Sequence, residues 1–509
     1  MVKVSYLMAM VGQKYRDRLY ALGLLLAAAF ALYANTFGHA WILDDFPVIV
    51  NNPDVQSLAG FWADSYPGRP LRELTFLLDH ALFGLDPAGW HVQNVFWHGV
   101  NAFLLFLLAD RLGCSRFVAW SAALLFLVHP VQVEVVANIS HRKDSLALAC
   151  ILLATLAYLR ALRPEARTLP WLAVALSLAL VGWTAKQNAV MLPLLWLGYE
   201  LAFVDRKNRL LLRQPKCLVA GAITATLGFL GWYLLGGGMP LHRQAMVGVM
   251  AKMTVYLNPD NVAPYFLMVL KSLTFMVGKL LWPLALAPEY VYPAPSGWFD
   301  PWVLGALAIL GIYGMLLWRA RRLWPPFFFA LLWIGLFWLP TANLWPLSYF
   351  AADRYLYTPT LGLALMTALV VERWCPPKNY LPAQVMAMGL LACCLLTWQQ
   401  NRVWATPLSL WTQAVRVAPE STSALNNLGG AYLELGQLER SLEFFHKAAA
   451  NFDNPMPWYN LGRVYEQLGD RDKAIFHYRS FLAFNDPVTA QLARRLRLRL
   501  FRQYGIQLR

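Results

Sequence analysis

Long apolar stretches alternate with short polar segments along most of the chain. Twelve stretches between residues 19 and 398 are predominantly apolar, and each approaches the ~20 residues that an α-helix needs to cross a bilayer. These stretches are 19–37, 93–109, 117–131, 145–161, 169–184, 188–204, 217–237, 262–282, 301–318, 323–339, 357–373 and 381–398. The pattern predicts an all-α, polytopic membrane helix bundle over residues 1–398.

The basic residues between these stretches predict an orientation. Four of them precede the first stretch, and the loop 205–216 is also basic, so the positive-inside bias places both segments in the cytoplasm. If all twelve stretches crossed the membrane, however, the arginines at 319–322 would lie on the outer side. One stretch must therefore fail to cross.

The weakest stretch is 262–282, which Pro264, Lys271 and Lys279 interrupt. Its two lysines are eight residues apart and share a helical face, as in a helix that lies in the interface or re-enters. About eleven crossings remain. Five segments are then expected on the outer side: 38–92, 130–142, 238–300, 340–356 and everything after 399.

Composition agrees with this interpretation. Hydrophobic residues make up 58% of the 509 residues and charged residues 14%, whereas soluble domains are about one quarter charged. The net charge of +15 comes mostly from loops between apolar stretches, which indicates contact with anionic lipid rather than nucleic acid. The six cysteines form no CxxC pair, which argues against a thiolate metal site or a disulfide framework.

The carboxyl-terminal part follows a different pattern, a repeat with a 33-residue shift. Residues Leu428, Gly429, Tyr432, Gly436, Phe445 and Ala448 recur as Leu461, Gly462, Tyr465, Gly469, Tyr478 and Phe481. This is a tetratricopeptide pattern, which predicts a short α-solenoid over 399–487. A basic helix over 488–509 either caps the array or rests on lipid headgroups.

Acidic residues at the outer ends of the predicted helices are the first candidate for chemistry. Asp44 and Asp45 follow the first helix, and Glu134 lies in HPVQVEVV after the third. Carboxylates at a membrane boundary are costly and suggest function, and a neighbouring charge can raise one pKa so that the group accepts a proton. The alternative for Asp44 and Asp45 is a helix cap.

Polar and basic residues on other predicted helices complete the pattern. His91, Asn94, His98 and Asn101 share one stripe of an apolar helix, and they either line a sugar-hydroxyl pocket or bond neighbouring helices. The basic residues near outer helix ends suit a phosphate or diphosphate at headgroup level. They are Arg69, Arg142, Lys186 and Arg354, which Lys279 could join. No Walker-type loop or GxGxxG motif is present.

The order of these motifs resembles that of the O-mannosyltransferases with transmembrane helices and tetratricopeptide repeats, and of their bacterial relatives in the GT-C superfamily. The shared motifs are Asp-Asp, NNPDV, RPL, GWHVQNVFWHGVN, HPVQVEVV, Lys-Gln and ADRYLY, followed by the repeats. The likeness extends over residues of about 35 to 480. Two features depart from the family: Gln187 stands where an acidic residue is common, and only about two repeats are present.

The resemblance implies an inverting glycosyltransferase that moves a sugar from a polyprenyl-phosphate donor to a serine or threonine of a periplasmic or exported protein. Asp44 is then the expected general base, Asp45 its partner or a donor ligand, and Glu134 the second acidic position. Arg69, Lys186 and Arg354 match basic motif positions, which we assign to the lipid phosphate. If the enzyme needs Mg²⁺ or Mn²⁺, Asp45 and Glu134 are the candidate ligands. The expected location is a bacterial inner membrane with the repeats in the periplasm.

Two other functions remain open from the sequence. The chain could transfer a sugar or a whole oligosaccharide to a glycan or lipid acceptor, because the same acidic and basic residues would serve that reaction. It could also be a non-catalytic scaffold whose repeats dock partners. The sugar, the acceptor, the isoprenoid length and the oligomeric state are not encoded in any motif we identify.

Overall fold

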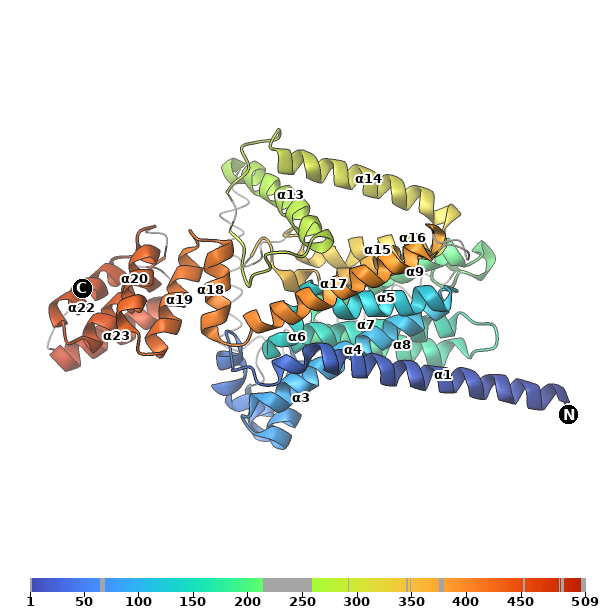
Figure 1. Cartoon of the computed structure of the whole chain (residues 1–509), viewed down its shortest axis with the longest axis horizontal. Helices are drawn as coiled ribbons and strands as arrows, with labels where there is room; N and C mark the ends of the chain where they lie inside the picture. Colours follow the sequence, from blue (N-terminus) through green and yellow to red (C-terminus); the bar gives the residue numbers. More distant parts are fainter. Residues whose placement is uncertain are drawn as a thin grey trace. The chain divides into compact units, whose positions relative to one another are not determined.

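The computed structural model is helical throughout the residues that it describes, with no strand among them (Figure 1). It describes residues 2–504 except 65–68, 214–258, 292, 345–346, 348, 375–379, 452–453, 485 and 487–488. The predicted helix 217–237 therefore lies outside the described residues. The predicted all-α class is confirmed.

The described chain divides into two compact units. The first comprises residues 1–286 and 294–405, and the second comprises 287–293 and 406–509. The second unit therefore includes a short segment from the connection between two helices of the first. The long helices of the first unit are α1 (Val2–Tyr33), α4 (Pro87–Arg111), α5 (Arg116–Val128), α7 (Arg142–Ala161), α8 (Thr168–Ala185), α9 (Leu192–Phe203), α13 (Pro259–Leu281), α14 (Pro301–Leu323), α15 (Pro325–Trp338), α16 (Tyr357–Trp374) and α17 (Leu381–Val403).

Small residues let the helices of the first unit approach closely. A Cβ at Gly99 of α4 would meet Leu26 of α1 at 2.9 Å, and one at Gly362 of α16 would meet a backbone oxygen of α15 at 2.6 Å. Such contacts are typical of helix packing in membranes, where dispersion and close backbone approach replace the hydrophobic effect. Helix α7 is the most buried of the candidate membrane spans, because 78% of its most apolar part lies inside the unit.

Six helices in the described part are long and apolar enough to cross a membrane, or seven if the bent pair around Pro130 is one span. Several of the predicted stretches form helices that are too short to cross a membrane by themselves. Helix α9 has only 12 residues and α15 only 14, because prolines and polar turns cut the apolar runs. Conversely, the helix Val262–Leu281 is long and apolar enough to cross a membrane. The positive-inside bias led us to predict that this segment does not cross. Its Lys271 is buried and lies 4.0 Å from Asp300, which explains how this charge is accommodated.

Short helices between α1 and α4 fold over the ends of the long ones. They are η2 (Phe46–Val50), η3 (Pro53–Val55), α2 (Leu58–Asp64) and α3 (Pro70–Phe83). Val48, Val55, Phe76 and Trp90 pack into one apolar cluster that also includes Ile139. This cluster fixes the first loop against the segment that contains η4 (Pro130–Gln132), α6 (Val133–Ala137) and η5 (Ile139–His141).

The second unit is a stack of helical hairpins. Its helices are α18 (Pro407–Val417), α19 (Thr422–Glu434), α20 (Leu438–Ala449), α21 (Met456–Gln467), α22 (Arg471–Ala483) and α23 (Ala490–Tyr504). Gly436 and Gly469 end α19 and α21 with φ of 71° and 78°, the left-handed conformation that glycine tolerates. Leu496 and Leu500 pack α23 against the last repeat, so this helix caps the array.

Candidate functional site

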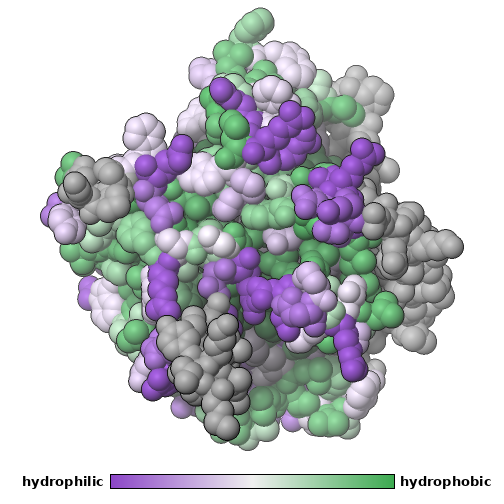
Figure 2. All heavy atoms as spheres, turned by 90° about the vertical axis from the view of Figure 1, so that its right-hand side faces the viewer, coloured by the Kyte–Doolittle hydropathy of each residue, from purple (hydrophilic) through white to green (hydrophobic). Residues whose placement is uncertain are grey.

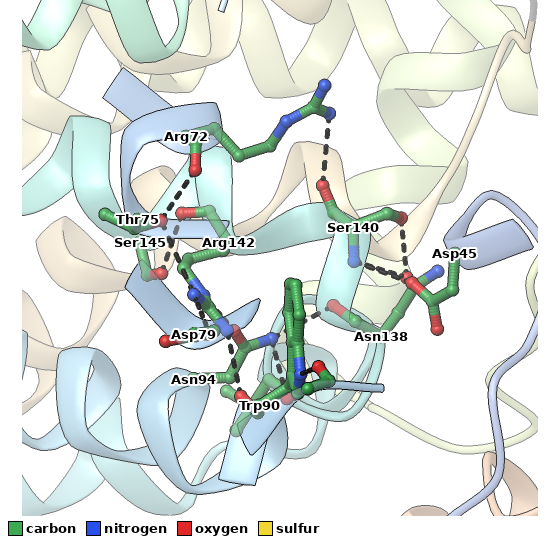
Figure 3. A network of polar contacts seen from close by, with 12 residues as sticks. Asp45, Arg72, Thr75, Asp79, Trp90, Asn94, Asn138, Ser140, Arg142 and Ser145 are labelled. Atoms are coloured by element: carbon green, nitrogen blue, oxygen red, sulfur yellow. Dashed lines mark hydrogen bonds and ion pairs between the residues drawn. The ribbon is translucent and has the colours of Figure 1, made fainter. Parts of the chain in front are cut away.

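The two adjacent aspartates have different environments. Asp45 is fully buried, and its carboxylate accepts hydrogen bonds from the backbone N–H groups of Ser140 at 2.8 Å and Ile42 at 3.2 Å. Figure 3 shows its side chain directed at Ser140. Asp44 is exposed, and its carboxylate makes no hydrogen bond with any residue that the structure describes. The turn therefore leaves the carboxylate of Asp44 accessible, whereas backbone hydrogen bonds hold the carboxylate of Asp45.

The turn that holds these aspartates is strained. Leu43 has a φ of 49°, which is costly for a residue with a branched side chain. The Asp45 N–H donates to the Ile42 carbonyl at 2.9 Å, which closes the turn from the other side. Burial raises the pKa of the Asp45 carboxyl to about 7, although the N–H groups of Ser140 and Ile42 favour its charged form. Backbone strain that the surroundings enforce is common at functional sites.

Glu134 holds Arg354, a residue 220 positions away. One carboxylate oxygen lies 2.5 Å from the guanidinium of Arg354, and the other accepts its backbone N–H at 2.7 Å. Glu134 is only 2% exposed, whereas the Arg354 side chain is 17% exposed. Tyr349 and Tyr355 stack near the guanidinium, at 5.1 and 5.3 Å from its central carbon. Glu134 thus fixes Arg354 in place and is not itself a free base.

Further basic residues converge on the first turn of α7. Lys143 is partly exposed and has no hydrogen bond or ion pair with any described residue. The charges of Arg69, Arg72 and Arg354 all act on it, and so does the opposite charge of Asp144. A basic group without a charged partner in such surroundings is costly, so Lys143 suits a bound anion. We call Arg69, Arg72, Lys143, Lys186 and Arg354 the cationic site.

Two members of the cationic site are fixed by neighbouring groups. Lys186 forms an ion pair with the buried carboxylate of Asp144. Arg69 donates to the carbonyl of Ala185 at 2.6 Å, one residue before Lys186. Asp144, which follows Lys143 in the first turn of α7, therefore holds Lys186 of the α8 end at this turn.

Arg72 connects the cationic site to the aspartate turn. It pairs with Glu73 at 3.1 Å, and it donates to the carbonyl of Ser140 at 3.5 Å. Because Asp45 accepts the N–H of the same Ser140, the turn and the cationic site meet at one residue (Figure 3). Residues 138–144 are thus the point where the first loop, α3 and α7 come together.

The structure places Arg142 outside the cationic site, although the sequence assigns it to the phosphate. It is fully buried, and its guanidinium bonds Asp79 at 2.5 Å, Asn94 at 2.7 Å and the carbonyl of Trp90 at 2.9 Å (Figure 3). Its hydrogen-bonding groups are thus directed at α3 and α4. We expect Arg142 to hold the helices rather than a ligand.

Three residues of the polar stripe on α4 bond neighbouring segments, as one of the two interpretations of the stripe predicts. Asn94 donates to the carbonyls of Val136 and Asn138, while His98 and Asn101 both contact the hydroxyl of Tyr357. All four stripe residues are buried. Both ring nitrogens of His91 are buried and lack a partner among the described residues.

Lys279 is the last of the basic residues that the sequence analysis assigned to the phosphate. Lys279 donates to the carbonyls of Leu284 and Ala285, and the charge of Asp353 acts on it. No group of three or more metal-binding side chains occurs among the described residues. The oxygens of Asp45 and Glu134 accept hydrogen bonds from backbone N–H groups and from Arg354.

Arg72 and Lys143 were missed by the sequence analysis. The signal for Lys143 is present in the triplet Arg-Lys-Asp at 142–144. Successive residues of a helix point about 100° apart, so only one of the two basic residues can face the site. The sequence alone favours neither.

Comparisons with known proteins agree with the resemblance. The chain is 26% identical to protein O-mannosyl-transferase TMTC3 of Mus musculus over 89% of this chain and 54% of that protein. It is also 26% identical to protein O-mannosyl-transferase Tmtc1 of Drosophila melanogaster, over 82% of this chain and 59% of that one. The predicted resemblance to this group is therefore confirmed. The chain spans about half the length of the curated relatives that it matches.

Two further comparisons concern parts of the fold. The tetratricopeptide repeat family matches residues 422–450 and 457–485, which confirms the predicted repeats. Among solved structures, ArnT from Cupriavidus metallidurans bound to undecaprenyl phosphate aligns over 84% of this chain and 75% of its own. The TM-score is 0.42 and the identity 16%.

Proposed function

We propose that this protein is a membrane glycosyltransferase that moves a sugar from a polyprenyl-phosphate donor to a serine or threonine hydroxyl of a protein, with inversion at the anomeric carbon. The observation that carries the proposal is the cationic site, which Ser140 connects to the turn with the exposed Asp44, whose carboxylate makes no hydrogen bond with a described residue. The similarity to protein O-mannosyl-transferases supports a transferase of this class.

The charges of the site suit a phosphate leaving group. Transfer breaks the bond between the anomeric carbon and the phosphate oxygen, and the phosphate gains negative charge as the bond breaks. Arg354 is held by Glu134, so it can stabilise that charge without rearrangement, and Lys143 adds a positive charge that no described residue pairs. Arg354 is preorganised by Glu134, and Lys186 by Asp144.

Asp44 is the proposed general base. The acceptor hydroxyl has a high pKa, so its proton is transferred late, as the oxygen bonds to the anomeric carbon. Asp44 then receives the proton, and the dianionic lipid phosphate leaves. Asp45 positions this base, because its two backbone hydrogen bonds fix the turn that presents Asp44.

The repeats are proposed to guide a polypeptide acceptor on the periplasmic side of a bacterial inner membrane. A stack of helical hairpins offers an extended concave surface, which suits a linear ligand. Asparagines line successive hairpins of this unit: Asn460 donates to Asn426 at 2.9 Å. Whether the acceptor is instead a glycan or a lipid is decided by assay.

The experiment that tests this function measures transfer from a polyprenyl-phosphate sugar to an acceptor peptide in membranes. The variant Asp44→Asn should lose at least about a hundredfold in rate, because general-base catalysis contributes about 10²–10⁴-fold. The matched control is Asp86→Asn. Asp86 caps the start of α4 by accepting the Ala88 N–H, and asparagine caps equally well. Normal transfer by the Asp44 variant would support a non-catalytic scaffold instead.

A further inference from the structure

The opposite ends of α4 and α7 carry a second group of basic residues. Arg111 is the last residue of α4, Arg160 lies in the last turn of α7, and Arg163 follows in the turn before α8. Arg18 of α1 faces the same place, and the charges of all three other arginines act on Arg111. We call these four residues the arginine cluster. Because α7 starts at the cationic site and α8 ends there, Arg160 and Arg163 lie at the opposite ends of these two helices.

The cluster has more positive charge than its partners compensate. Arg18 pairs with Asp110 at 3.0 Å, while Arg160 and Arg163 share Glu165 at 3.2 and 3.8 Å. Arg111 is half-buried and has no hydrogen bond or ion pair within the described part of the chain. Within the described residues, two carboxylates thus pair with three of the four guanidinium groups, and Arg111 has none. The free donors of Arg111 suit an oxyanion, which a guanidinium binds through two parallel hydrogen bonds.

The surroundings of the cluster are those of a lipid rather than of a free anion. Leu19, Tyr20 and Leu24 of α1 are 52%, 68% and 60% exposed, directly beyond Arg18. Leu169 and Trp171 are exposed where α8 begins, just after the turn that contains Arg163. Figure 2 shows hydrophilic side chains distributed among apolar ones on this end of the molecule. Apolar surface for acyl chains therefore adjoins the basic residues.

We propose that the arginine cluster binds the phosphodiester headgroup of an anionic phospholipid. The headgroup lies between the ends of α4 and α7 and compensates Arg111, while the acyl chains lie along the exposed faces of α1 and α8. Basic pockets between the ends of membrane helices bind anionic lipids in this way. The site is separate from the cationic site and does not depend on the proposed transferase activity.

The test compares lipid retention by the purified full-length protein. Native mass spectrometry counts phosphatidylglycerol and phosphatidylcholine molecules that stay bound as each lipid is titrated. The wild-type protein should retain one phosphatidylglycerol more tightly than phosphatidylcholine. Arg111→Gln should weaken that retention about tenfold, as expected for about 1.4 kcal/mol. Arg163→Gln, at an exposed position, should also weaken the retention of phosphatidylglycerol. It replaces Arg111→Gln in the experiment if that variant is unstable.

The matched control is Arg319→Gln, which removes an exposed arginine from the last part of α14, outside the cluster. This variant should retain phosphatidylglycerol as the wild type does. Equal losses in the Arg111 and Arg319 variants would show nonspecific electrostatic attraction and overturn the proposal. Equal retention of the two lipids, or displacement of phosphatidylglycerol by excess inorganic phosphate, would also overturn it.

Discussion

The cationic site and the arginine cluster lie at opposite ends of the same helices, yet their charges are held in different ways. At the cationic site the carboxylates that hold basic residues are buried: Glu134 is 2% exposed and Asp144 1%. At the arginine cluster the carboxylates are open to solvent, with Asp110 36% and Glu165 59% exposed. A buried partner fixes a cation in one place, whereas an exposed pair contributes little and rearranges easily.

This difference separates two uses of positive charge. A leaving phosphate is stabilised best by charges that do not move during the reaction, and buried carboxylates provide that rigidity. A lipid headgroup needs charge and adaptability, and arginines with exposed partners provide these. Changing one residue in each region tests whether buried and exposed partners hold these charges differently.

The largest effect is expected from the buried pair next to the cationic site. Arg142→Met leaves Asp79 and Asn94 buried without their partner, which should reduce the free energy of unfolding by about 3–5 kcal/mol. Arg160→Met removes an exposed pair and should cost less than about 1 kcal/mol. Thermal unfolding of both variants in the same detergent measures the contrast. Equal shifts of the midpoint would show that burial does not distinguish the two ends.

The sequence predicted most of the helices because apolar periodicity is a local property of the chain. It also predicted that Asp44, Glu134, Arg69, Lys186 and Arg354 lie near the outer ends of different helices. It did not predict which groups are free, because that depends on contacts between distant segments. Glu134 binds a residue 220 positions away, and Asp45 binds one 95 positions away.

Consecutive residues set a second limit on what the sequence can predict. Asp44 and Asp45 are identical and adjacent, and Arg142 and Lys143 are adjacent and both basic. In each pair one side chain is buried in the framework and the other is more accessible. A shift of one position along a helix turns the side chain by about 100°, so local composition cannot distinguish them.

The next effect concerns the residue that positions Arg354. Glu134→Gln keeps the shape of the side chain but removes its charge, so Arg354 loses its ion pair and should move more freely. We expect the transfer rate to fall about a hundredfold, the effect of removing one preorganised charge-stabilising group. The fall should appear mainly in kcat, with a smaller rise in KM for the lipid donor. Steady-state kinetics with a polyprenyl-phosphate sugar measures both.

A matched change in an exposed pair serves as the control for Glu134. Glu443→Gln disrupts the ion pair with Lys447 on α20, in which both side chains are 55% exposed. This variant should transfer sugar at the wild-type rate. If Glu134→Gln does so too, Arg354 does not depend on that carboxylate.

The smallest expected effect is the pH dependence of Asp45, the buried residue that holds the turn of Asp44. Burial raises the pKa of Asp45 from 3.8 to about 7 in the folded protein. Between about pH 4 and pH 7 the folded state therefore holds a proton that the unfolded state has lost, so the contribution of Asp45 to stability declines as pH rises through this range. The charged form, however, is the one that accepts hydrogen bonds from both Ser140 and Ile42.

Stability and activity should therefore depend on pH in opposite directions at this residue. The transfer rate should rise several-fold as pH increases through about 7, because deprotonation strengthens the two bonds that hold the Asp44 turn. Asp45→Asn cannot ionise and should show a lower rate without that rise. A pH–rate profile of both proteins, measured with saturating donor, decides the matter. A rise that persists in Asp45→Asn would assign the titration to another group and leave Asp45 as part of the framework only.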